Sequence, residues 1–202
     1  MEKGKCKGYK DSVPGGLSHQ MRRRRLQRKE EESARAVVDP AKARERVFQR
    51  AAKLLAAKPR SVAELRERLL QGRGATKANV DEVIARLREY GYLDDAKFAQ
   101  SYASLRVRER PIGRRRLERD LWLKKVDKQT AEVALDEVFA ATPEEELIDR
   151  AIAKRIRLRG RPKSREEAKK LFDHLIRQGF AFELVSDKVH AILKSEVDEP
   201  GQ

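Results

Sequence analysis

A pair of leucines four residues apart occurs three times along this 202-residue chain, and this repetition constrains the fold more than any other feature. The pairs are Leu65 and Leu69, Leu117 and Leu121, and Leu171 and Leu175. The first leucines of successive pairs are separated by 52 and then by 54 residues. Leucines four apart lie on the same side of an α-helix, so each pair predicts a buried helical stripe. A period near 50 residues predicts tandem copies of one small structural unit.

Each copy contains apolar stripes for three helices, separated by turn residues. In the first copy, Ser61 and Glu64 match a capping box, and Gly91 is a natural helix stop. In the third copy we expect Thr142 as an N-cap, with Pro143 in the first helical position. The sequence therefore predicts an all-α fold of three tandem three-helix repeats that form an elongated, curved molecule.

The breaks between the stripes predict the domain boundaries. We expect repeats over residues 41–92, 93–141 and 142–195, a flexible basic N-terminal extension over 1–40, and a flexible tail over 196–202. The extension contains the run "MRRRRLQRKEEE", which is either a solvated charged helix or a basic arm. The apolar runs are far shorter than the ~20 residues of a membrane span, so we expect a cytoplasmic protein.

Catalytic motifs are not recognisable, and the sequence predicts a protein that is not an enzyme. The stretch "GRGAT" lacks the Gly-Lys-Ser/Thr of a phosphate-binding loop, and the lone Cys6 provides neither a disulfide nor a cysteine metal site. His174 and His190 lie on predicted helices, and neither is followed by a carboxylate or a second His three or four residues later. We therefore expect no cofactor and no metal.

The stretch "GYLDDAKFAQSY" places two adjacent carboxylates, Asp94 and Asp95, in a strongly basic chain. Either carboxylate can accept a hydrogen bond from a first-turn N–H and oppose the positive end of a helix. A Mg²⁺-dependent nuclease built around the pair is another possibility, but the stretch offers no further ligands. We expect a structural junction between repeats, with Phe98 and Tyr102 in the core.

The net charge of +15 predicts attraction to a polyanion, with nucleic acid as the first candidate. Lys and Arg outnumber acids by ten to three over residues 97–125 and by eleven to three over 150–177. One predicted helix face in the second region carries Arg150, Lys154, Arg157 and Arg161. The candidate contacts to a partner or to DNA are Arg106, Arg108, Arg114, Arg115, Arg119, Lys124, Lys125, Lys154, Arg157, Arg159, Arg161 and Lys163.

Two features of the basic regions allow alternative interpretations. The segment "RGRPKSR" resembles the core of an AT-hook, which inserts arginine into a narrow minor groove, but Gly160 and Pro162 are also ordinary turn residues. Trp122 can stack on a base, although packing between repeats is the commoner role of a lone tryptophan. For Tyr90 and Tyr92, the sequence favours core packing at the junction.

The segment "GYLDDAKFAQSYASLRVRERPIGRRRLERDLWLKK" resembles the signature of the RecX family, regulators of the RecA recombinase. The residues that carry the resemblance are Gly91, Tyr92, Leu93, Asp94, Asp95, Phe98, Tyr102, Arg106, Gly113, Leu117 and Leu121. It extends over residues from about 43 to 194, and the extension before it has no assigned counterpart. The family commonly has Lys-Gly before a branched apolar residue where this chain has Lys124, Lys125 and Val126, which leaves the construction of that helix end open.

The resemblance implies a non-enzymatic regulator that lies in the groove of the RecA filament on DNA and represses filament growth, ATP hydrolysis and strand exchange. The expected partners are therefore the RecA filament and single- or double-stranded DNA, bound weakly and without sequence preference by a monomer. The alternative is a free-standing DNA-binding or architectural protein that uses the basic faces and the "RGRP" turn.

Overall fold

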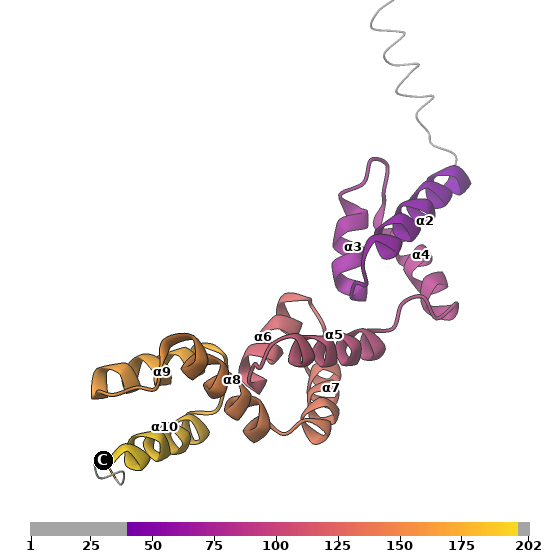
Figure 1. The fold of residues 1–202 in the computed structure, drawn as a ribbon. Helices are drawn as coiled ribbons and strands as arrows, with labels where there is room; N and C mark the ends of the chain where they lie inside the picture. The colour runs from indigo at the N-terminus through magenta and orange to yellow at the C-terminus, as the bar shows by residue number, and fades with distance from the viewer. Residues whose placement is uncertain (1–39, 198–202) are drawn as a thin grey trace, which may run out of the picture. The chain divides into compact units, whose positions relative to one another are not determined.

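The computed structural model describes residues 40–197, with side chains described as far as Lys194, and a compact unit begins at Arg44. Every regular element of this region is an α-helix, as the sequence predicts (Figure 1). The helices are α2 (Pro40–Ala57), α3 (Val62–Leu70), α4 (Lys77–Glu89), α5 (Asp95–Glu109), α6 (Arg114–Leu123), α7 (Lys128–Ala141), α8 (Glu144–Arg159), α9 (Arg165–Arg177) and α10 (Phe182–Val197). Below, repeat 1 is α2–α4, repeat 2 is α5–α7 and repeat 3 is α8–α10.

The predicted N-terminal extension, with its basic run and Cys6, lies outside the described residues except for Pro40. The predicted tail over 196–202 lies outside them apart from the last two residues of α10. Within the region that the structure does describe, no helix is long and apolar enough to cross a membrane.

Short polar side chains begin five of the helices. The capping residues are Ser61, Thr76, Asp94, Asp127 and Ser164. Each side chain accepts a hydrogen bond from a backbone N–H two or three residues further along the chain. Such caps satisfy donors that the first helical turn leaves without an intrahelical partner, so the helix starts are set by local sequence.

The connection between α7 and α8 differs from the prediction. Thr142 does not cap α8 but ends α7, where its N–H donates to the carbonyl of Val138 at 2.9 Å. Pro143 is the N-cap residue of α8 rather than its first helical residue. Only these two residues separate the helices, and Thr142 is already used to close the last turn of α7.

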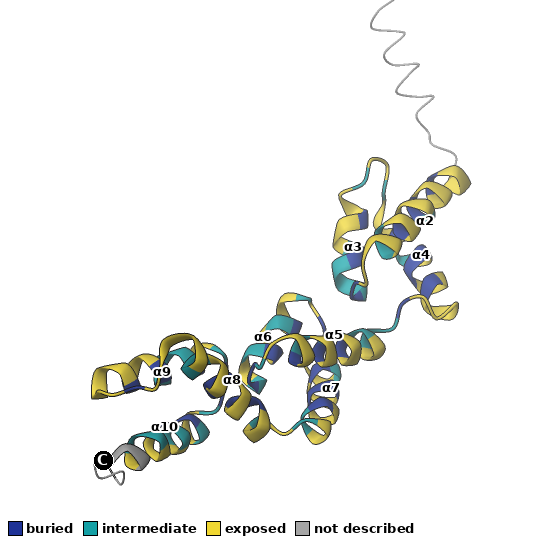
Figure 2. Ribbon diagram, viewed as in Figure 1, coloured by how far each residue is buried: buried dark blue, intermediate teal, exposed yellow. Residues whose placement is uncertain are grey.

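The repeated leucine pairs all lie in the core, where none of the six residues is more than 4% exposed. Buried residues form stripes along the helices and exposed residues cover the opposite faces (Figure 2). Repeat 1 has its own cluster of nine buried residues, from Val47 to Leu93. Repeats 2 and 3 share one cluster of 21, from Ala99 to Val189. The buried apolar surface is therefore continuous between the last two repeats and interrupted after the first.

Two glycines bring the backbones of repeats 2 and 3 together. The N–H of Gly113 donates to the carbonyl of Gln178 at 3.0 Å, and that of Arg115 donates to the carbonyl of Gly179 at 3.2 Å. A Cβ atom on Gly113 would lie 2.3 Å from backbone atoms of Gly179 and Phe180. Gly113 has no side chain with which to cap α6, so carbonyls of repeat 3 satisfy donors at the start of this helix.

Polar contacts connect repeat 1 with repeat 2. The Ser61 hydroxyl donates to the carbonyl of Lys124, and the N–H of Val62 donates to Oδ1 of Asp95 at 2.8 Å. Both donors lie at the start of α3, and both acceptors lie in repeat 2. Hydrogen bonds and ion pairs, rather than a shared core, therefore mark this junction.

The end of α6 has the same construction as the glycine-containing ends of α4 and α9. Lys125 has a φ of 60°, in the left-handed region that Gly91 and Gly179 occupy with φ of 72° and 90°. The N–H of Val126 donates to the carbonyl of Leu121 at 3.2 Å, as in a Schellman motif. A residue with a Cβ atom costs about 1 kcal/mol in this conformation. The lysine at this position is therefore strained but does not alter the helix end.

Candidate functional site

Four of the twelve candidate cations have acidic partners within the chain. The ion pairs are Arg106–Asp120 at 3.2 Å, Arg114–Asp136 at 2.6 Å, Lys124–Glu64 at 3.7 Å and Lys125–Glu67 at 2.5 Å. The first two pairs lie within repeat 2, and the two lysine pairs connect repeat 2 with α3. A polyanion would have to compete with these carboxylates, so the four residues are weaker candidates for an external contact.

The other eight candidates are all exposed. No ion pair with another described residue is found for Arg108, Arg115, Arg119, Lys154, Arg157, Arg159 and Lys163. Arg161 is exposed as well. The seven residues belong to α5, α6, α8 and the connection from α8 to α9, so the candidate cations without an ion pair lie in repeats 2 and 3.

The cationic stripe predicted on α8 is shorter in the structure. Its exposed members on the helix are Arg150, Lys154 and Arg157, and Ile148 and Ile152 on the other side of the helix are buried. Arg161 lies beyond the helix, because Gly160 takes a φ of 82° and ends α8 after Arg159. Pro162 is buried, which fits a packed turn better than an AT-hook. The prediction of a four-residue stripe is therefore wrong for Arg161.

Three aromatic residues for which the sequence favours packing are exposed instead. Trp122 is 71% exposed, Tyr90 54% and Tyr92 70%. Trp122 follows the buried Leu121 by one residue, about 100° further around α6, so it points outward. The sequence signal for this exposure is the position of Trp122 relative to Leu117 and Leu121, which mark the buried side of the helix. Tyr90 and Tyr92 follow the last residue of α4 and form an edge-to-face pair with ring centroids 6.4 Å apart.

Asp94 and Asp95 have different partners. Asp94 caps α5 and accepts hydrogen bonds from the N–H groups of Ala96 and Lys97, and the bond from Lys97 lowers the pKa of its carboxyl. Asp95 instead accepts the N–H of Val62 in repeat 1, and its partial burial raises its pKa. Capping by Asp94 is confirmed. The contact made by Asp95 depends on tertiary structure and has no local signal in the sequence.

The remaining signature residues form the end of repeat 1 and the start of repeat 2. Gly91 ends α4 with a positive φ, and Leu93 is buried in the core of repeat 1. Phe98 and Tyr102 pack against the shared core, as predicted, with their rings stacked at a centroid distance of 5.9 Å. Apart from the exposed Tyr92, this segment is used for packing and helix termination.

Glu64 is a junction residue for which the sequence predicts only a capping role. Its carboxylate lies among four cations: Arg60, which donates a hydrogen bond to it, Arg68 at 3.5 Å, Lys124 at 3.7 Å and Lys58 at 3.8 Å. Burial alone would raise the pKa of Glu64, but Lys124, Arg60 and Lys58 outweigh it and the pKa lies below its usual value. Three of the cations belong to repeat 1 and one to repeat 2, so the carboxylate links the two.

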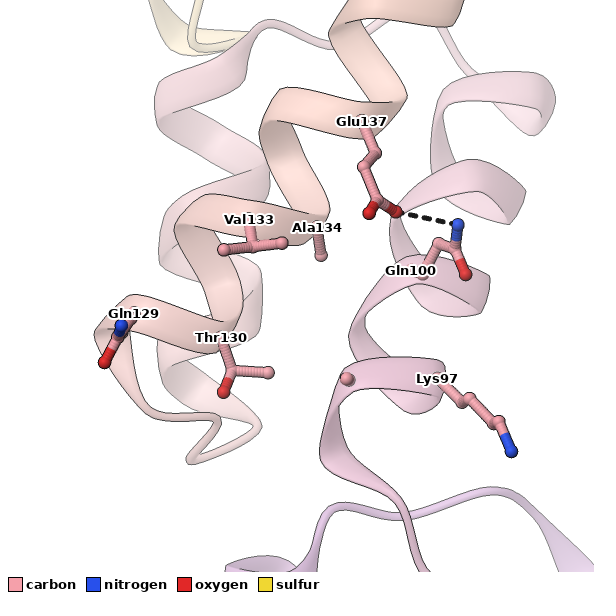
Figure 3. A pocket seen from close by; sticks show the side chains of 8 residues that line it. Lys97, Gln100, Gln129, Thr130, Val133, Ala134 and Glu137 are labelled. Atoms are coloured by element: carbon pink, nitrogen blue, oxygen red, sulfur yellow. Dashed lines mark hydrogen bonds between the residues drawn. The ribbon is translucent and has the colours of Figure 1, made fainter.

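A hollow lies between α5 and α7 (Figure 3). Gln100 donates to Glu137 across it at 2.8 Å, and Thr130 and Val133 line its α7 side. Lys97 extends away from the middle of the hollow. Over residues 40–197, no group of three or more His, Cys, Asp or Glu side chains has a geometry that could hold a metal ion. The hollow presents amide, carboxylate and methyl groups without an arrangement that indicates a reaction.

Comparison with known proteins identifies the family. Residues 48–87 match the first three-helix domain of RecX, and residues 94–135 match the second. A regulatory protein RecX from Chlorobium limicola is 32% identical over 146 residues, which cover 72% of this chain and 88% of that protein. The chain belongs to the RecX family. A regulatory protein RecX from Bacillus licheniformis is 29% identical over 139 residues, covering 69% of this chain and 52%, about half, of that relative.

Solved RecX structures share the fold. The crystal structure of RecX from Lactobacillus salivarius aligns with a TM-score of 0.66 at 19% identity, covering 77% of this chain and 99% of that one. A second crystal structure, of a regulatory protein RecX, aligns with a TM-score of 0.64 at 20% identity and covers 81% and 77%. The predicted helical-repeat architecture is thereby confirmed, and the chain shares it with a family of regulatory proteins.

Proposed function

We propose that this RecX-family chain binds the RecA–DNA filament as a cytoplasmic monomer and restrains it, mainly by inhibiting ATP hydrolysis, filament extension and strand exchange. The chain takes part in DNA repair, recombination and the SOS response through this inhibition, without catalysing a reaction itself. The observation that carries the proposal is the set of exposed cations on repeats 2 and 3 that have no acidic partner among the described residues.

Charge and repetition support this function. A filament on DNA presents phosphates and protein side chains at regular intervals, and a chain of repeats can meet several of them at once. Contacts that are individually weak then add through simultaneous engagement. Because the candidate cations are exposed, their contacts should weaken as salt rises. Binding to DNA alone should be weak for the same reason. It should also lack sequence preference, because contacts with phosphates do not read the bases.

Charge reversal on repeats 2 and 3 tests the proposal. The variant Arg108→Glu, Lys154→Glu and Arg157→Glu replaces three exposed cations that have no ion-pair partner among residues 40–197. We expect it to require at least about tenfold more protein for half-maximal inhibition of the DNA-dependent ATPase of preformed RecA filaments.

A variant with the same change of charge in repeat 1 provides the control. Arg46, Lys53 and Arg73 are exposed, and changing all three to Glu should leave inhibition close to that of the unchanged chain. Unchanged inhibition by the first variant, or equal loss in both, would refute the assignment to repeats 2 and 3. Tight duplex binding without RecA, lost when residues 1–40 are deleted, would favour a free-standing DNA-binding protein.

A further inference from the structure

The outer face of α6 carries an unusual combination of side chains. Arg115, Arg119 and Trp122 follow one another at intervals of four and three residues, so they lie along one side of the helix. All three are exposed, and Trp122 is exposed to 71%. Glu118 is the one acidic residue among the exposed residues of α6. A long basic side chain one turn from an exposed indole ring provides charge and a flat apolar surface together.

Two arginines against the one carboxylate of Glu118 leave this face with a net positive charge. The neighbouring cations are occupied: Arg114 pairs with Asp136, and Arg116 donates to Gln178 at 2.9 Å. Arg115 and Arg119 have no side-chain partner among residues 40–197. Their guanidinium groups therefore remain available to an anion from outside.

A hollow lies beside Trp122 at the end of α6. Its lining consists of Trp122, Leu123, Lys125 and Val126, three apolar side chains and one cation. Leu123 is 62% exposed, so two large apolar residues meet solvent next to each other. This surface can cover one face of a flat, apolar ring.

We propose that the outer face of α6 binds single-stranded nucleic acid, with Trp122 stacked on an unpaired base and Arg115 and Arg119 on phosphates. Arg115 and Trp122 are seven residues apart, about 10 Å along the helix axis. A single strand with B-like rise places roughly three phosphates over that length, at about 3.4 Å each. The face is therefore long enough for two phosphate contacts and one stacked base.

Two considerations favour a single strand as the occupant. Bases inside a duplex are stacked on each other, whereas an unpaired base has a face free for an aromatic side chain. A protein partner would account for an exposed tryptophan equally well, but the net positive charge of the same face fits a polyanion. This contact adds a DNA-binding site to the function proposed above. Its biological role rests on that function, but the binding itself requires no RecA.

The fluorescence of Trp122 provides a direct test, since it is the only tryptophan of the chain. The full chain is titrated with single-stranded oligothymidylate, with the matching duplex and with an abasic strand of the same length. We expect saturable quenching by the single strand and little change with the duplex or the abasic strand. Saturated binding of the single strand, shown by anisotropy of a labelled oligonucleotide, without any change in Trp122 emission would overturn the proposal.

Variants separate stacking from charge. Trp122→Leu should weaken binding of the single strand by roughly 5- to 150-fold without changing the salt dependence, because stacking contributes about 1–3 kcal/mol per base. Trp122→Phe should retain most of the affinity. Changing Arg115 and Arg119 to Gln should instead lower the slope of log K against log salt by about 1.4, or about 0.7 for each phosphate contact.

Leu158 provides the matched control, since it is 66% exposed on α8. Leu158→Ala should leave the affinity for the single strand unchanged. All variants should keep the thermal midpoint of the unchanged chain, because the altered side chains are exposed. If Trp122→Leu leaves this affinity unchanged, the proposal is wrong. If it weakens only the binding to RecA filaments, the face contacts a protein and the RecA proposal still stands.

Discussion

The two junctions between repeats are built in different ways. Repeats 2 and 3 share one buried cluster, and Gly113 and Gly179 bring their backbones into direct contact. Repeat 1 has a separate cluster and meets repeat 2 through the Ser61 and Asp95 hydrogen bonds and the carboxylate of Glu64. Apolar packing and backbone contact are hardly affected by salt, whereas partly exposed charges are screened by it.

The difference indicates which parts of the chain behave as one unit. Interdigitated apolar side chains have few alternative arrangements, so repeats 2 and 3 should unfold together. Hydrogen bonds and ion pairs at the first junction can exchange with water at a small net cost. Repeat 1 should therefore separate from the rest under conditions that leave repeats 2 and 3 intact.

The largest expected effect comes from Gly113→Ala. The new Cβ atom would lie 2.3 Å from backbone atoms of Gly179 and Phe180, which cannot move without separating repeats 2 and 3. We expect a loss of about 3 kcal/mol in the free energy of unfolding, at the upper end of overpacking effects. Urea denaturation followed by circular dichroism measures this loss.

Gly74→Ala is the control for this change. Gly74 has a φ of 74°, but a Cβ atom there would meet nothing within 4 Å. It should cost only about 1 kcal/mol, from backbone strain. Equal losses in the two variants would mean that the contact between Gly113 and Gly179 does not hold repeats 2 and 3 together.

Glu64→Gln should have the next largest effect, at the junction of repeats 1 and 2. The change removes the negative charge from among Arg60, Arg68, Lys124 and Lys58, and we expect a loss of about 1–2 kcal/mol at neutral pH and low salt. Hydrogen exchange of repeat 1 amides should accelerate, while the core of repeats 2 and 3 stays protected. High salt should reduce the difference between variant and unchanged chain.

The pH dependence of this loss follows from the lowered pKa of Glu64. A carboxyl group whose pKa is lower in the folded state stabilises the fold above its unfolded-state pKa, about 4.3 for Glu. That contribution disappears as the pH falls through the folded-state pKa, so the two proteins should become equally stable in acid. Glu67→Gln, which removes a half-exposed pair with Lys125, should cost no more than about 0.5 kcal/mol and serves as the control. A Glu64→Gln effect that grows in acid would contradict this account.

Local sequence was sufficient for the helices and their order, apart from the two ends of α8, and insufficient for the junctions. The leucine pairs and the capping residues predict the repeats, because helical periodicity and N-caps act within a few residues. The contact of Asp95 with Val62 and the backbone contact of Gly113 join positions 33 and more residues apart. Such contacts exist only once the repeats have packed, so their residue types carry no separate signal.

The candidate site was predicted in part for the same reason. Counting charges identifies the basic regions, but only the fold shows that Lys124 and Lys125 have partners on α3 while Arg115 and Arg119 have none among the described residues. The exposure of Trp122 could have been predicted from the sequence, because the spacing of Leu117 and Leu121 places it outside the core.

The smallest effect concerns Lys125, where the first junction and a helix end overlap. Lys125→Gly should relieve a positive φ worth about 1 kcal/mol and lose the half-exposed pair with Glu67, for a net gain of about 0.5 kcal/mol. Lys125→Ala loses the same pair but keeps the strain, so it should be less stable than the glycine variant by about 1 kcal/mol. Thermal unfolding of the two variants measures the difference. Equal midpoints would mean that the left-handed conformation costs nothing here, and that the ion pair alone decides how this helix end responds to substitution.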